Sequence, residues 1–310
     1  MPTAAIIGAG FIGRAWAMVF ARQGWNVRIT DTSAAARKAA PKLLAAALKD
    51  QARHGLVRDP AGAAALIGMA ETLDEAARGA DLVQECALEA LEIKRELFAR
   101  LDAIAKPSAI IASSTSSIVA SLYTENLKGR ARCMVAHPVN PPHLVPVVEL
   151  CGAPWTSKAA LAKARKIYAS VGQVPVTVNK EIEGFVLNRL QGAVLAEAFR
   201  LVGEGYVTPQ DLDRTIKDGL GLRWSFMGPF ETIELNAPGG IPDYIARYMD
   251  IYRRLQKDPA TPAVFDAENV KRVIAAWGGT PPEAVRGKKS LWRDKRLAAL
   301  AAHKAKQPKS

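Results

Sequence analysis

Along roughly the first 180 positions of the chain, short apolar runs typical of strands alternate with the apolar spacing typical of amphipathic helices. The opening stretch, AAIIGAGFIGRAWAMVFARQGWNVRITD, predicts a buried strand, a tight turn, an amphipathic helix and a second strand. Further short apolar runs predict strands at ADLVQECAL, SAIIAS, RCMVAHP, VPVVELC and VGQVPVTV, with helices between most of them. Strands that alternate with helices indicate an α/β domain whose doubly wound sheet is mostly parallel.

The pattern changes after the segment EIEG at residues 181–184. The stretch that follows, GFVLNRLQGAVLAEAFRLVGEG, predicts a long helix, and everything beyond it predicts only helices and loops. We therefore expect two domains: residues 1–182 form the α/β domain, and residues 183–310 form a smaller all-helical domain. The long helix is apolar on more than one face, which indicates burial against the first domain or a second subunit.

Three glycines mark a candidate cofactor site in the turn after the first strand. Gly8, Gly10 and Gly13 form a GxGxxG pattern between a predicted strand and a predicted helix. The first permits the turn, the second lets a pyrophosphate approach the backbone, and the third lets helix pack on strand. Asp31 ends the next strand, where its carboxylate accepts hydrogen bonds from the adenosine ribose and repels a 2′-phosphate. The pattern predicts a Rossmann-type site that prefers NAD to NADP, although Arg28 and Arg37 lie close enough in sequence to soften that preference.

A second candidate site lies in the stretch HPVNPPHLVPVVE, residues 137–149. Imidazole is the side chain whose ordinary pKa lies nearest neutrality, and a carboxylate on its second nitrogen fixes the tautomer and stabilises the imidazolium. The prolines after His137 fix φ and remove backbone donors, so we expect a rigid loop and a returning strand, LVPVVEL, that aims Glu149. The stretch therefore predicts a His137–Glu149 acid/base pair. A hydrogen-bonded structural histidine is the competing interpretation.

A cluster of hydroxyl side chains, SSTS at residues 113–116, ends the strand SAIIAS. The carboxyl ends of strands are where open α/β sheets bind their ligands. A hydroxyl in this position also caps a helix, and for three of the four residues we accept that interpretation.

The net charge of +12 raises the question of a nucleic-acid partner, because clustered Lys and Arg bind phosphates. The densest basic run is RGKKSLWRDKRLAALAAHKAKQPKS, residues 286–310, which we interpret as a solvated terminal helix with a frayed tail. An excess of positive charge would also attract an anionic cofactor and substrate. We expect no nucleic-acid partner.

The number of cysteines and the N-terminal sequence predict the cellular compartment. Three scattered cysteines are too few for a disulfide framework or a cysteine-based metal site, so we expect no metal and a reducing compartment. The first residues enter a strand with no basic segment leading into an apolar run, and no apolar stretch is long enough to span a bilayer. We expect a cytoplasmic protein without a membrane partner.

Several motifs resemble, in the same order, those of the 3-hydroxyacyl-CoA dehydrogenase family over nearly the whole chain: GAGFIGRAWA, VQECALEALEIK, SSTSS, VAHPVNPP, VELCG, EIEGFVLNRLQ and DGLGLRWSFMGPFET. The resemblance is strongest to the lambda-crystallin, or L-gulonate 3-dehydrogenase, branch. It implies NAD-dependent oxidation of a hydroxyl group and an intimate homodimer through the helical domain. The catalytic group that it implies comprises Ser116, His137, Glu149 and Asn188. Besides the glycines, the cofactor contacts that it implies are Phe11, Ile12, Asp31, Glu89, Lys94, Ser116 and Asn140.

Some of these residues also have a purely structural interpretation. Asn188 is a candidate substrate contact, and it could equally be a buried amide that bonds the interdomain backbone. Glu89 and Lys94 would also be explained as a solvated pair on a helix, and only the resemblance favours a role at the cofactor.

The substrate is the point at which the chain departs from the acyl-CoA members of the family it resembles. Those members carry small or neutral residues before the matching MGP, whereas this chain has LRWSFMGP. Arg223 offers a planar charged fork for the carboxylate of a small 3-hydroxy acid such as L-gulonate, unless it pairs with Asp218 or Glu231. Trp224 and Phe226 leave a cationic substrate such as carnitine open, because aromatic faces attract quaternary ammonium groups. The sequence is also compatible with a 3-hydroxyacyl-CoA dehydrogenase and with a non-catalytic, crystallin-like structural or NAD-sensing protein.

Overall fold

The computed structural model describes residues 1–307, and their contacts divide the chain into two compact units. The first unit combines Met1–Asn188 with the C-terminal segment that begins at Gly287, and the second unit is Arg189–Arg286. The first boundary lies close to the predicted one between residues 182 and 183. The C-terminal segment differs from the prediction, because its contacts place it with the first unit.

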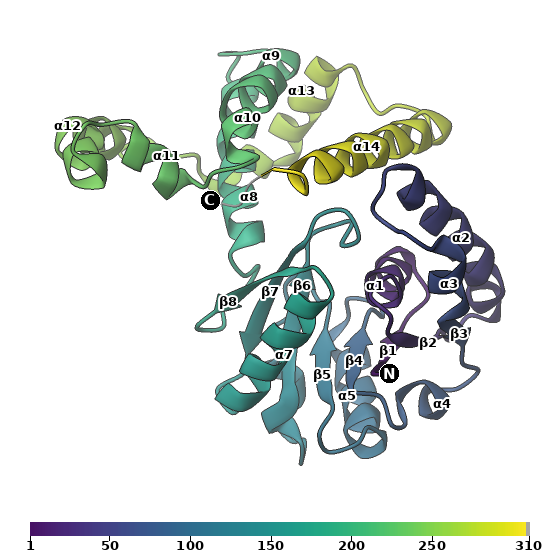
Figure 1. The fold of residues 1–310 in the computed structure, drawn as a ribbon. Coiled ribbons are helices and arrows are strands. Elements are labelled where there is room, and N and C mark those ends of the chain that lie inside the picture. Colours follow the sequence, from purple (N-terminus) through teal and green to yellow (C-terminus); the bar gives the residue numbers. More distant parts are fainter. Residues whose placement is uncertain (308–310) are drawn as a thin grey trace. The chain divides into compact units, whose positions relative to one another are not determined.

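The first unit is built on one sheet of eight strands in the order β3-β2-β1-β4-β5-β6-β7-β8 (Figure 1). The strands are β1 (Thr3–Ile7), β2 (Asn26–Thr30), β3 (Ile67–Met69), β4 (Leu82–Glu85), β5 (Ile110–Ser113), β6 (Cys133–Pro138), β7 (Val147–Gly152) and β8 (Val174–Val178). All neighbouring strands are parallel except β6 and β7, which are antiparallel. The predicted doubly wound, mostly parallel α/β fold is therefore confirmed.

Helices cover both faces of this sheet. One face packs against α1 (Phe11–Ala21), α2 (Ala34–Arg53), α3 (Pro60–Ala65) and α7 (Lys158–Ser170). The other packs against α4 (Leu73–Ala77), α5 (Leu91–Ile104) and α6 (Ser121–Thr124). The first unit also contains the short 3-10 helix η1 (Arg130–Arg132) and, from Gly287 on, the C-terminal helix α14 (Glu283–Lys304). Because successive strand residues point to opposite faces, Ile6 joins the first core and Ile7 the second.

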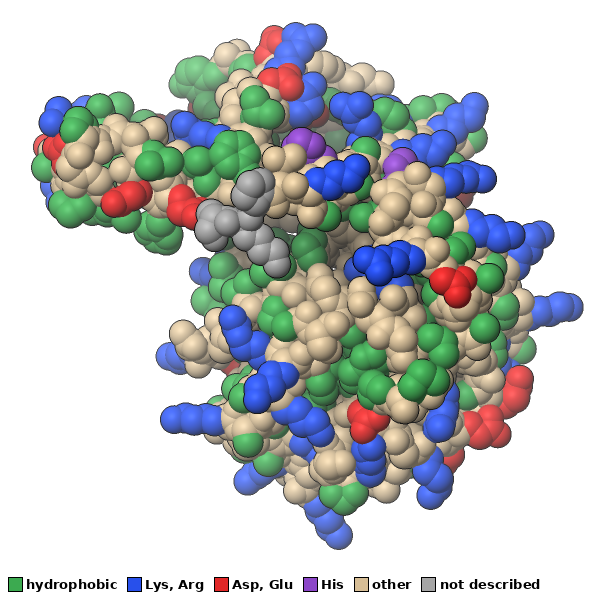
Figure 2. Space-filling model, viewed as in Figure 1, with side chains coloured by type: hydrophobic (Ala, Val, Ile, Leu, Met, Phe, Trp, Pro, Cys, Tyr) green, Lys and Arg blue, Asp and Glu red, His purple; other side chains and the backbone are tan. Residues whose placement is uncertain are grey.

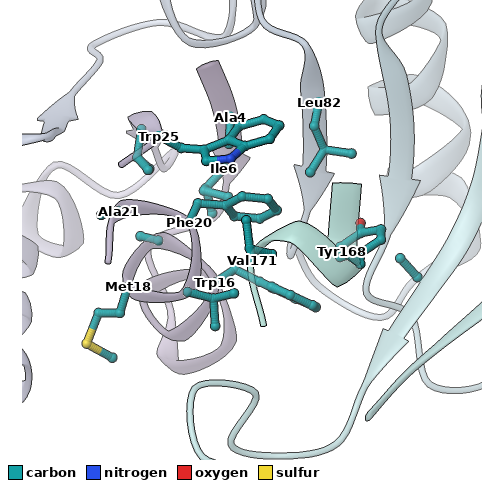
Figure 3. Packing of buried hydrophobic residues seen from close by; sticks show 14 of the residues in the cluster. Ala4, Ile6, Trp16, Met18, Phe20, Ala21, Trp25, Leu82, Tyr168 and Val171 are labelled. Atoms are coloured by element: carbon teal, nitrogen blue, oxygen red, sulfur yellow. The ribbon is translucent and has the colours of Figure 1, made fainter. Parts of the chain in front are cut away.

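Large aromatic side chains dominate the core under α1 (Figure 3). The ring centroids of Trp16 and Tyr168 of α7 are 5.4 Å apart, and those of Phe20 and Trp25 are 5.3 Å apart, both in tilted arrangements. Trp16, Phe20 and Tyr168 are fully buried. Burying a side chain such as Phe20 contributes about 1.5–3 kcal/mol, so this core holds α1, and the glycine turn before it, rigidly on the sheet.

The second unit contains helices only. Its first element is α8 (Leu187–Gly203), which enters the unit at Arg189. The others are α9 (Pro209–Arg214), the π-helix η2 (Thr215–Leu220), α10 (Gly221–Trp224), α11 (Pro229–Leu235), α12 (Gly240–Leu255), the 3-10 helix η3 (Pro262–Phe265) and α13 (Ala267–Trp277). Thr208 caps α9 through the backbone N–H of Asp211, as its position before Pro209 predicts. The predicted helical character of this part of the chain is confirmed.

The surface is basic and holds no spanning segment. On the face drawn in Figure 2, Lys and Arg side chains are spread among apolar and polar ones. No helix within residues 1–307 is long and apolar enough to cross a membrane. The same residues contain no group of His, Cys, Asp and Glu side chains that would hold a metal ion. The predicted terminal helix is α14, and the last three residues of the predicted frayed tail, 308–310, lie outside the described part of the chain.

Candidate active site

The glycine turn connects β1 to α1 at the point where the sheet changes winding direction. Gly8 has φ +114°, and a Cβ on it would meet the carbonyl oxygen of Cys86 at 2.5 Å. A Cβ on Gly13 would collide with the carbonyl oxygen of Gly8, so α1 approaches the turn as closely as the pattern predicts. Gly10 has no atom within 4 Å of such a Cβ. This open face at the start of an 11-residue helix fits a pyrophosphate.

A cavity of about 880 Å³ adjoins this turn. Gly8, Gly10, Asp31 and Thr32 line its polar part, together with Arg37 and Glu71, and its apolar part includes Leu73, Leu88, Ile93 and Leu97. The oxygens of Asp31 accept from the N–H groups of Ala9 at 2.7 Å and Ser33 at 2.8 Å. Asp31 is thus fixed at the end of β2, beside the glycine turn, where a ribose is recognised in folds of this type.

A larger cavity, of about 1200 Å³, opens at the opposite edge of the sheet. It is lined by residues that precede β5 and β6, among them Lys106, Ser108 and Arg132. None of the predicted site residues lines it. Since ligands of open α/β sheets bind at the carboxyl ends of the strands, the smaller cavity is the better candidate for the site.

His137 and Glu149 lie directly opposite each other on β6 and β7. The Nδ1 atom of His137 is 2.8 Å from Oε2 of Glu149, and both side chains are buried, with exposed fractions of 4% and 2%. Because Nδ1 faces the carboxylate, Nε2 is the nitrogen left for chemistry with a ligand. The antiparallel turn between β6 and β7 therefore produces the arrangement of a general base with an orienting carboxylate.

The second oxygen of Glu149 anchors the start of α8. Oε1 accepts from the N–H groups of Val186 at 2.8 Å and Leu187 at 2.9 Å. Burial would raise the pKa of the Glu149 carboxyl, but the hydrogen bonds from His137 and these two N–H groups outweigh it and lower that pKa. Glu149 is therefore ionised near neutral pH, and one carboxylate organises both the imidazole and the first turn of the helix.

The sequence did not reveal the role of Phe185. This residue has φ +48°, a left-handed conformation that costs energy for a bulky side chain, and its fully buried ring lies 5.5 Å from the His137 ring. The long helix was predicted to run from residue 184 and begins instead at Leu187. The left-handed turn at Gly184 and Phe185 explains the difference, because a chain in that conformation cannot continue a right-handed helix.

Asn188 and Ser116 contact each other. Nδ2 of Asn188 donates to the backbone carbonyl of Ser116 at 2.9 Å, and the Ser116 side chain is exposed. Asn188 is half-buried, so its amide bonds the backbone and still has an accessible surface. The contact places Ser116 and Asn188 near the His137–Glu149 pair, because Asn188 directly follows Leu187, whose N–H binds Glu149.

The other three hydroxyls of the SSTS cluster are held by the protein itself. Ser113 donates to Glu85 at 2.5 Å, and Ser114 accepts from the indole N–H of Trp16 at 3.1 Å. Oγ1 of Thr115 accepts from the N–H of Ile118 at 2.9 Å. Their positions agree with a structural interpretation for three of the four residues.

Glu89 binds the backbone of the turn that contains Ser116. Its Oε1 atom accepts from Oγ1 of Thr115 and from the N–H groups of Ser116 at 3.0 Å and Ser117 at 3.2 Å. Burial would raise the pKa of the Glu89 carboxyl, but these hydrogen bonds and the charge of Lys94 lower it. Glu89 is thus an ionised group that fixes the backbone on which Ser116 stands.

Lys94 lies between two carboxylates. Its Nζ atom is 3.0 Å from Oε2 of Glu85 and 3.3 Å from Oε2 of Glu89, and its side chain is 1% exposed. A solvated helix pair is therefore a poor description of Lys94. In this position the ammonium reaches the Ser116 turn through Glu89.

The remaining candidates lie at the surface. Phe11 is exposed at the start of α1 and Ile12 is half-buried beside it. Asn140, also exposed, lies in the loop after β6. None of the three appears in the lining of the smaller cavity.

Arg223 belongs to the second unit, where it lies exposed on α10. Within residues 1–307 it forms no ion pair. Asp218 lies 3.3 Å from Lys217, and Glu231 accepts from the N–H of Gly228 at 2.7 Å. The two acids considered as its partners are thus engaged elsewhere, and the guanidinium is available to a ligand.

Comparison with known proteins places these features in a family. The model of the 3-hydroxyacyl-CoA dehydrogenase NAD binding domain matches residues 3–182, and the model of the 3-hydroxyacyl-CoA dehydrogenase C-terminal domain matches residues 184–273. The first match identifies NAD as the cofactor.

Individual relatives agree with the family models. Lambda-crystallin of Oryctolagus cuniculus is 39% identical over 96% of this chain and 94% of its own length. L-carnitine dehydrogenase of Pseudomonas putida is 40% identical over 75% of this chain and 72% of its own length. Among solved structures, 5-formyl-3-hydroxy-2-methylpyridine 4-carboxylic acid 5-dehydrogenase, described as an NAD+ dependent dismutase, superposes with a TM-score of 0.85 at 27% identity and covers 99% of this chain and 100% of its own. The chain belongs to the 3-hydroxyacyl-CoA dehydrogenase family.

Proposed function

We propose that this protein oxidises the 3-hydroxyl of a small free hydroxy acid, such as L-gulonate, to the 3-oxo acid with NAD. The observation that carries the proposal is the buried His137–Glu149 pair, whose Nδ1 and Oε2 atoms are 2.8 Å apart. The carboxylate holds Nδ1 of the imidazole and leaves Nε2 for a ligand, an arrangement that a non-catalytic, crystallin-like protein would not need.

His137 acts as the general base in this proposal. Its Nε2 atom accepts the hydroxyl proton of the substrate, and Glu149 stabilises the imidazolium that results. NAD, when bound, supplies the two-electron acceptor for the carbon that bears the hydroxyl. The open backbone at Gly10 would hold its pyrophosphate, and Asp31 would hold its adenosine ribose.

Ser116 and Asn188 orient the substrate oxygen. The exposed Ser116 hydroxyl lies on a turn that Glu89 fixes from one side and the Asn188 amide from the other. A hydroxyl on such a rigid turn donates to the oxygen without having to reorganise. Lys94 contributes by keeping Glu89 in place.

A small acid is favoured over an acyl-CoA by two observations. Arg223 is exposed and unpaired within the described residues, and a guanidinium binds a carboxylate through two parallel hydrogen bonds. Among the relatives, the structure with a TM-score of 0.85 is named for a pyridine carboxylic acid, and another relative is named for carnitine, itself a small 3-hydroxy acid. Carnitine is therefore the second candidate, with Trp224 and Phe226 exposed beside Arg223 to contact its quaternary ammonium group.

A substrate panel tests the proposal. In the native enzyme we expect kcat/KM for L-gulonate or carnitine to exceed that for 3-hydroxybutyryl-CoA. Arg223→Met should lower the free-acid values by about 10- to 100-fold, because a hydrogen bond to a charged group contributes about 1.5–3 kcal/mol. NADH absorbance gives these rates directly.

The control for this panel is Arg214→Met, which removes an exposed arginine already paired with Asp211 at 2.6 Å. It should leave kcat/KM unchanged for the three substrates named above and for 3-hydroxybutyrate, the fourth member of the panel. A native preference for the CoA thioester, or intact free-acid kcat/KM values in Arg223→Met, would show that Arg223 does not bind the substrate carboxylate.

Glu149→Gln should reduce turnover less than loss of His137 does and should displace the pH–rate profile. The amide no longer stabilises the imidazolium, so the acidic limb of kcat/KM for alcohol oxidation should move to lower pH. An unchanged profile would exclude the dyad.

The same substitution has an acid-stability signature. The folded state lowers the pKa of the Glu149 carboxyl below its ordinary value of 4.5. Its contribution to stability is therefore complete above pH 4.5 and is lost as the pH falls through the lower, folded-state value. In urea titrations between neutral and acidic pH, the native protein should lose more stability below pH 4.5 than Glu149→Gln does.

We also propose that two copies associate through the helical unit. Helix α12 has no buried residue and leaves Ile245, Tyr248, Ile251 and Leu255 between 42% and 60% exposed. A row of this size on one helix face is unusual for a free surface and is typical of a subunit interface. The helical domain is thus assigned a role in dimerisation as well as in substrate binding.

A further inference from the structure

Arg37 lines the cofactor cavity, and its guanidinium forms two hydrogen bonds within the protein. It donates from one terminal nitrogen to the backbone carbonyl of Asp31 at 2.6 Å and from the other to Oε2 of Glu71 at 2.9 Å. Arg37 is mostly buried, with 18% of its side chain exposed, whereas the Glu71 side chain is 74% exposed. Both residues line the cavity together with Gly8, Gly10 and Asp31.

The position of this pair matters because the end of β2 is where NAD and NADP are distinguished. An acid there binds the 2′-hydroxyl of NAD, and an arginine nearby accommodates the 2′-phosphate of NADP. This chain has both groups, so Asp31 alone does not determine which cofactor is preferred. The preference for NAD or NADP also depends on whether the Arg37 guanidinium is free to bind a phosphate.

We propose that Glu71 is a specificity-determining residue that keeps Arg37 from serving as a 2′-phosphate site. Its carboxylate binds one terminal nitrogen of Arg37 while the other donates to the backbone carbonyl of Asp31, so neither terminal nitrogen is left for a phosphate. Glu71 also adds a second negative charge to that of Asp31 in the lining of the same cavity. Arg37 in turn holds the backbone of Asp31, so the ion pair also positions the ribose acceptor. This role belongs to the cofactor site and does not depend on the identity of the substrate.

Of the two neighbouring arginines, Arg28 is engaged elsewhere and, within residues 1–307, Arg100 is not. The guanidinium of Arg28 donates to the backbone carbonyls of Glu75 at 3.3 Å and Arg78 at 2.7 Å. Arg100 lines the same cavity from α5 and is the remaining cation in its lining. The test must therefore distinguish Arg37 from Arg100, and a general loss of negative charge from a release of Arg37.

Binding of two small probes to the full-length protein separates these explanations without any turnover. Adenosine 2′,5′-bisphosphate carries the distinguishing phosphate and 5′-AMP lacks it, and calorimetry gives the ratio of their dissociation constants. Glu71→Gln should shift this ratio toward the 2′-phosphate probe by about tenfold, equivalent to about 1.4 kcal/mol. Asp31→Ala should shift it as well, and Glu71→Gln with Asp31→Ala should shift it further than either alone.

Two controls make the result specific. Glu96→Gln removes a carboxylate from the same cavity lining but from a residue that does not pair with Arg37, and it should leave the ratio unchanged. Adding Arg37→Met to Glu71→Gln should abolish the gain. The proposal is overturned by an unchanged ratio in Glu71→Gln, an equal gain in Glu96→Gln, or a gain that survives Arg37→Met. Equal melting temperatures without ligand would establish that each variant is folded.

Discussion

His137→Gln is expected to lower kcat by about 100- to 10,000-fold while NAD affinity stays within about twofold of the native value, because loss of a general base has an effect of that size on rate. The side chain is bonded to Glu149 at 2.8 Å and does not line the cofactor cavity, so the defect should fall on the chemical step. Stopped-flow or steady-state measurement of NADH formation and a separate NAD titration give the two quantities. A variant that keeps more than about a tenth of native turnover would remove His137 from the mechanism.

His143→Gln, in the loop that follows β6, offers a matched control. Burial, followed by the charge of Arg22, lowers the pKa of His143 to about 4, so its imidazole is neutral at pH 7. His143 has no acidic partner at Nδ1, which is buried and unbonded within residues 1–307. Its replacement should leave most of the turnover intact. A loss as large as that of His137→Gln would mean that the loop as a whole, rather than one imidazole, is sensitive to substitution.

The His137–Glu149 pair shows how much of the site could be predicted from the sequence. Local pattern predicted a strand at RCMVAHP that carries His137 and a returning strand, LVPVVEL, that carries Glu149. The antiparallel register of β6 and β7 brings the two side chains together. That prediction depended only on the short loop between two strands. The fold class followed in the same way, from apolar periodicity and from the GxGxxG pattern, in which Gly8 and Gly13 leave no room for a Cβ atom.

Contacts between distant segments could not be predicted in this way. The N–H groups that hold the second oxygen of Glu149 come from residues 186 and 187, and the strained Phe185 beside them carries no sequence signal of its own. Glu71, which occupies Arg37, lies on a loop between β3 and α4. Each of these contacts is formed only when the sheet is assembled, because backbone groups and exposed acids have many possible partners before folding.

Lys94 is the clearest case in which local pattern suggests the wrong environment. It stands on α5 among Glu92, Arg95 and Glu96, and such a sequence is typical of a solvated helix face. In the folded protein its side chain is 1% exposed and lies between Glu85, which is fully buried, and Glu89. The buried ammonium is what allows two carboxylates to lie under the turn that carries Ser116.

Lys94→Met is therefore expected to destabilise the protein by about 3–5 kcal/mol, the usual effect of removing one partner of a buried ion pair. Met fills a similar volume, so most of the loss comes from the uncompensated charge of Glu85, whose remaining partners are the hydroxyl of Ser113 and the N–H of Ala87. Urea unfolding measures the change. The neighbouring Arg95→Met removes an exposed ion pair with Glu92 and should cost only about 0–1 kcal/mol.

A double variant distinguishes charge from packing as the cause. Glu85→Gln combined with Lys94→Met replaces the buried pair with neutral groups, and it should be more stable than Lys94→Met alone because no ionised carboxylate is left without its cation at that position. If the double variant is the less stable of the two, or if Lys94→Met costs no more than Arg95→Met, then the ion pair is not what supports this part of the site. In the expected case, Lys94→Met should also weaken turnover, since Glu89 loses its nearest cation and holds the N–H groups of Ser116 and Ser117 less firmly.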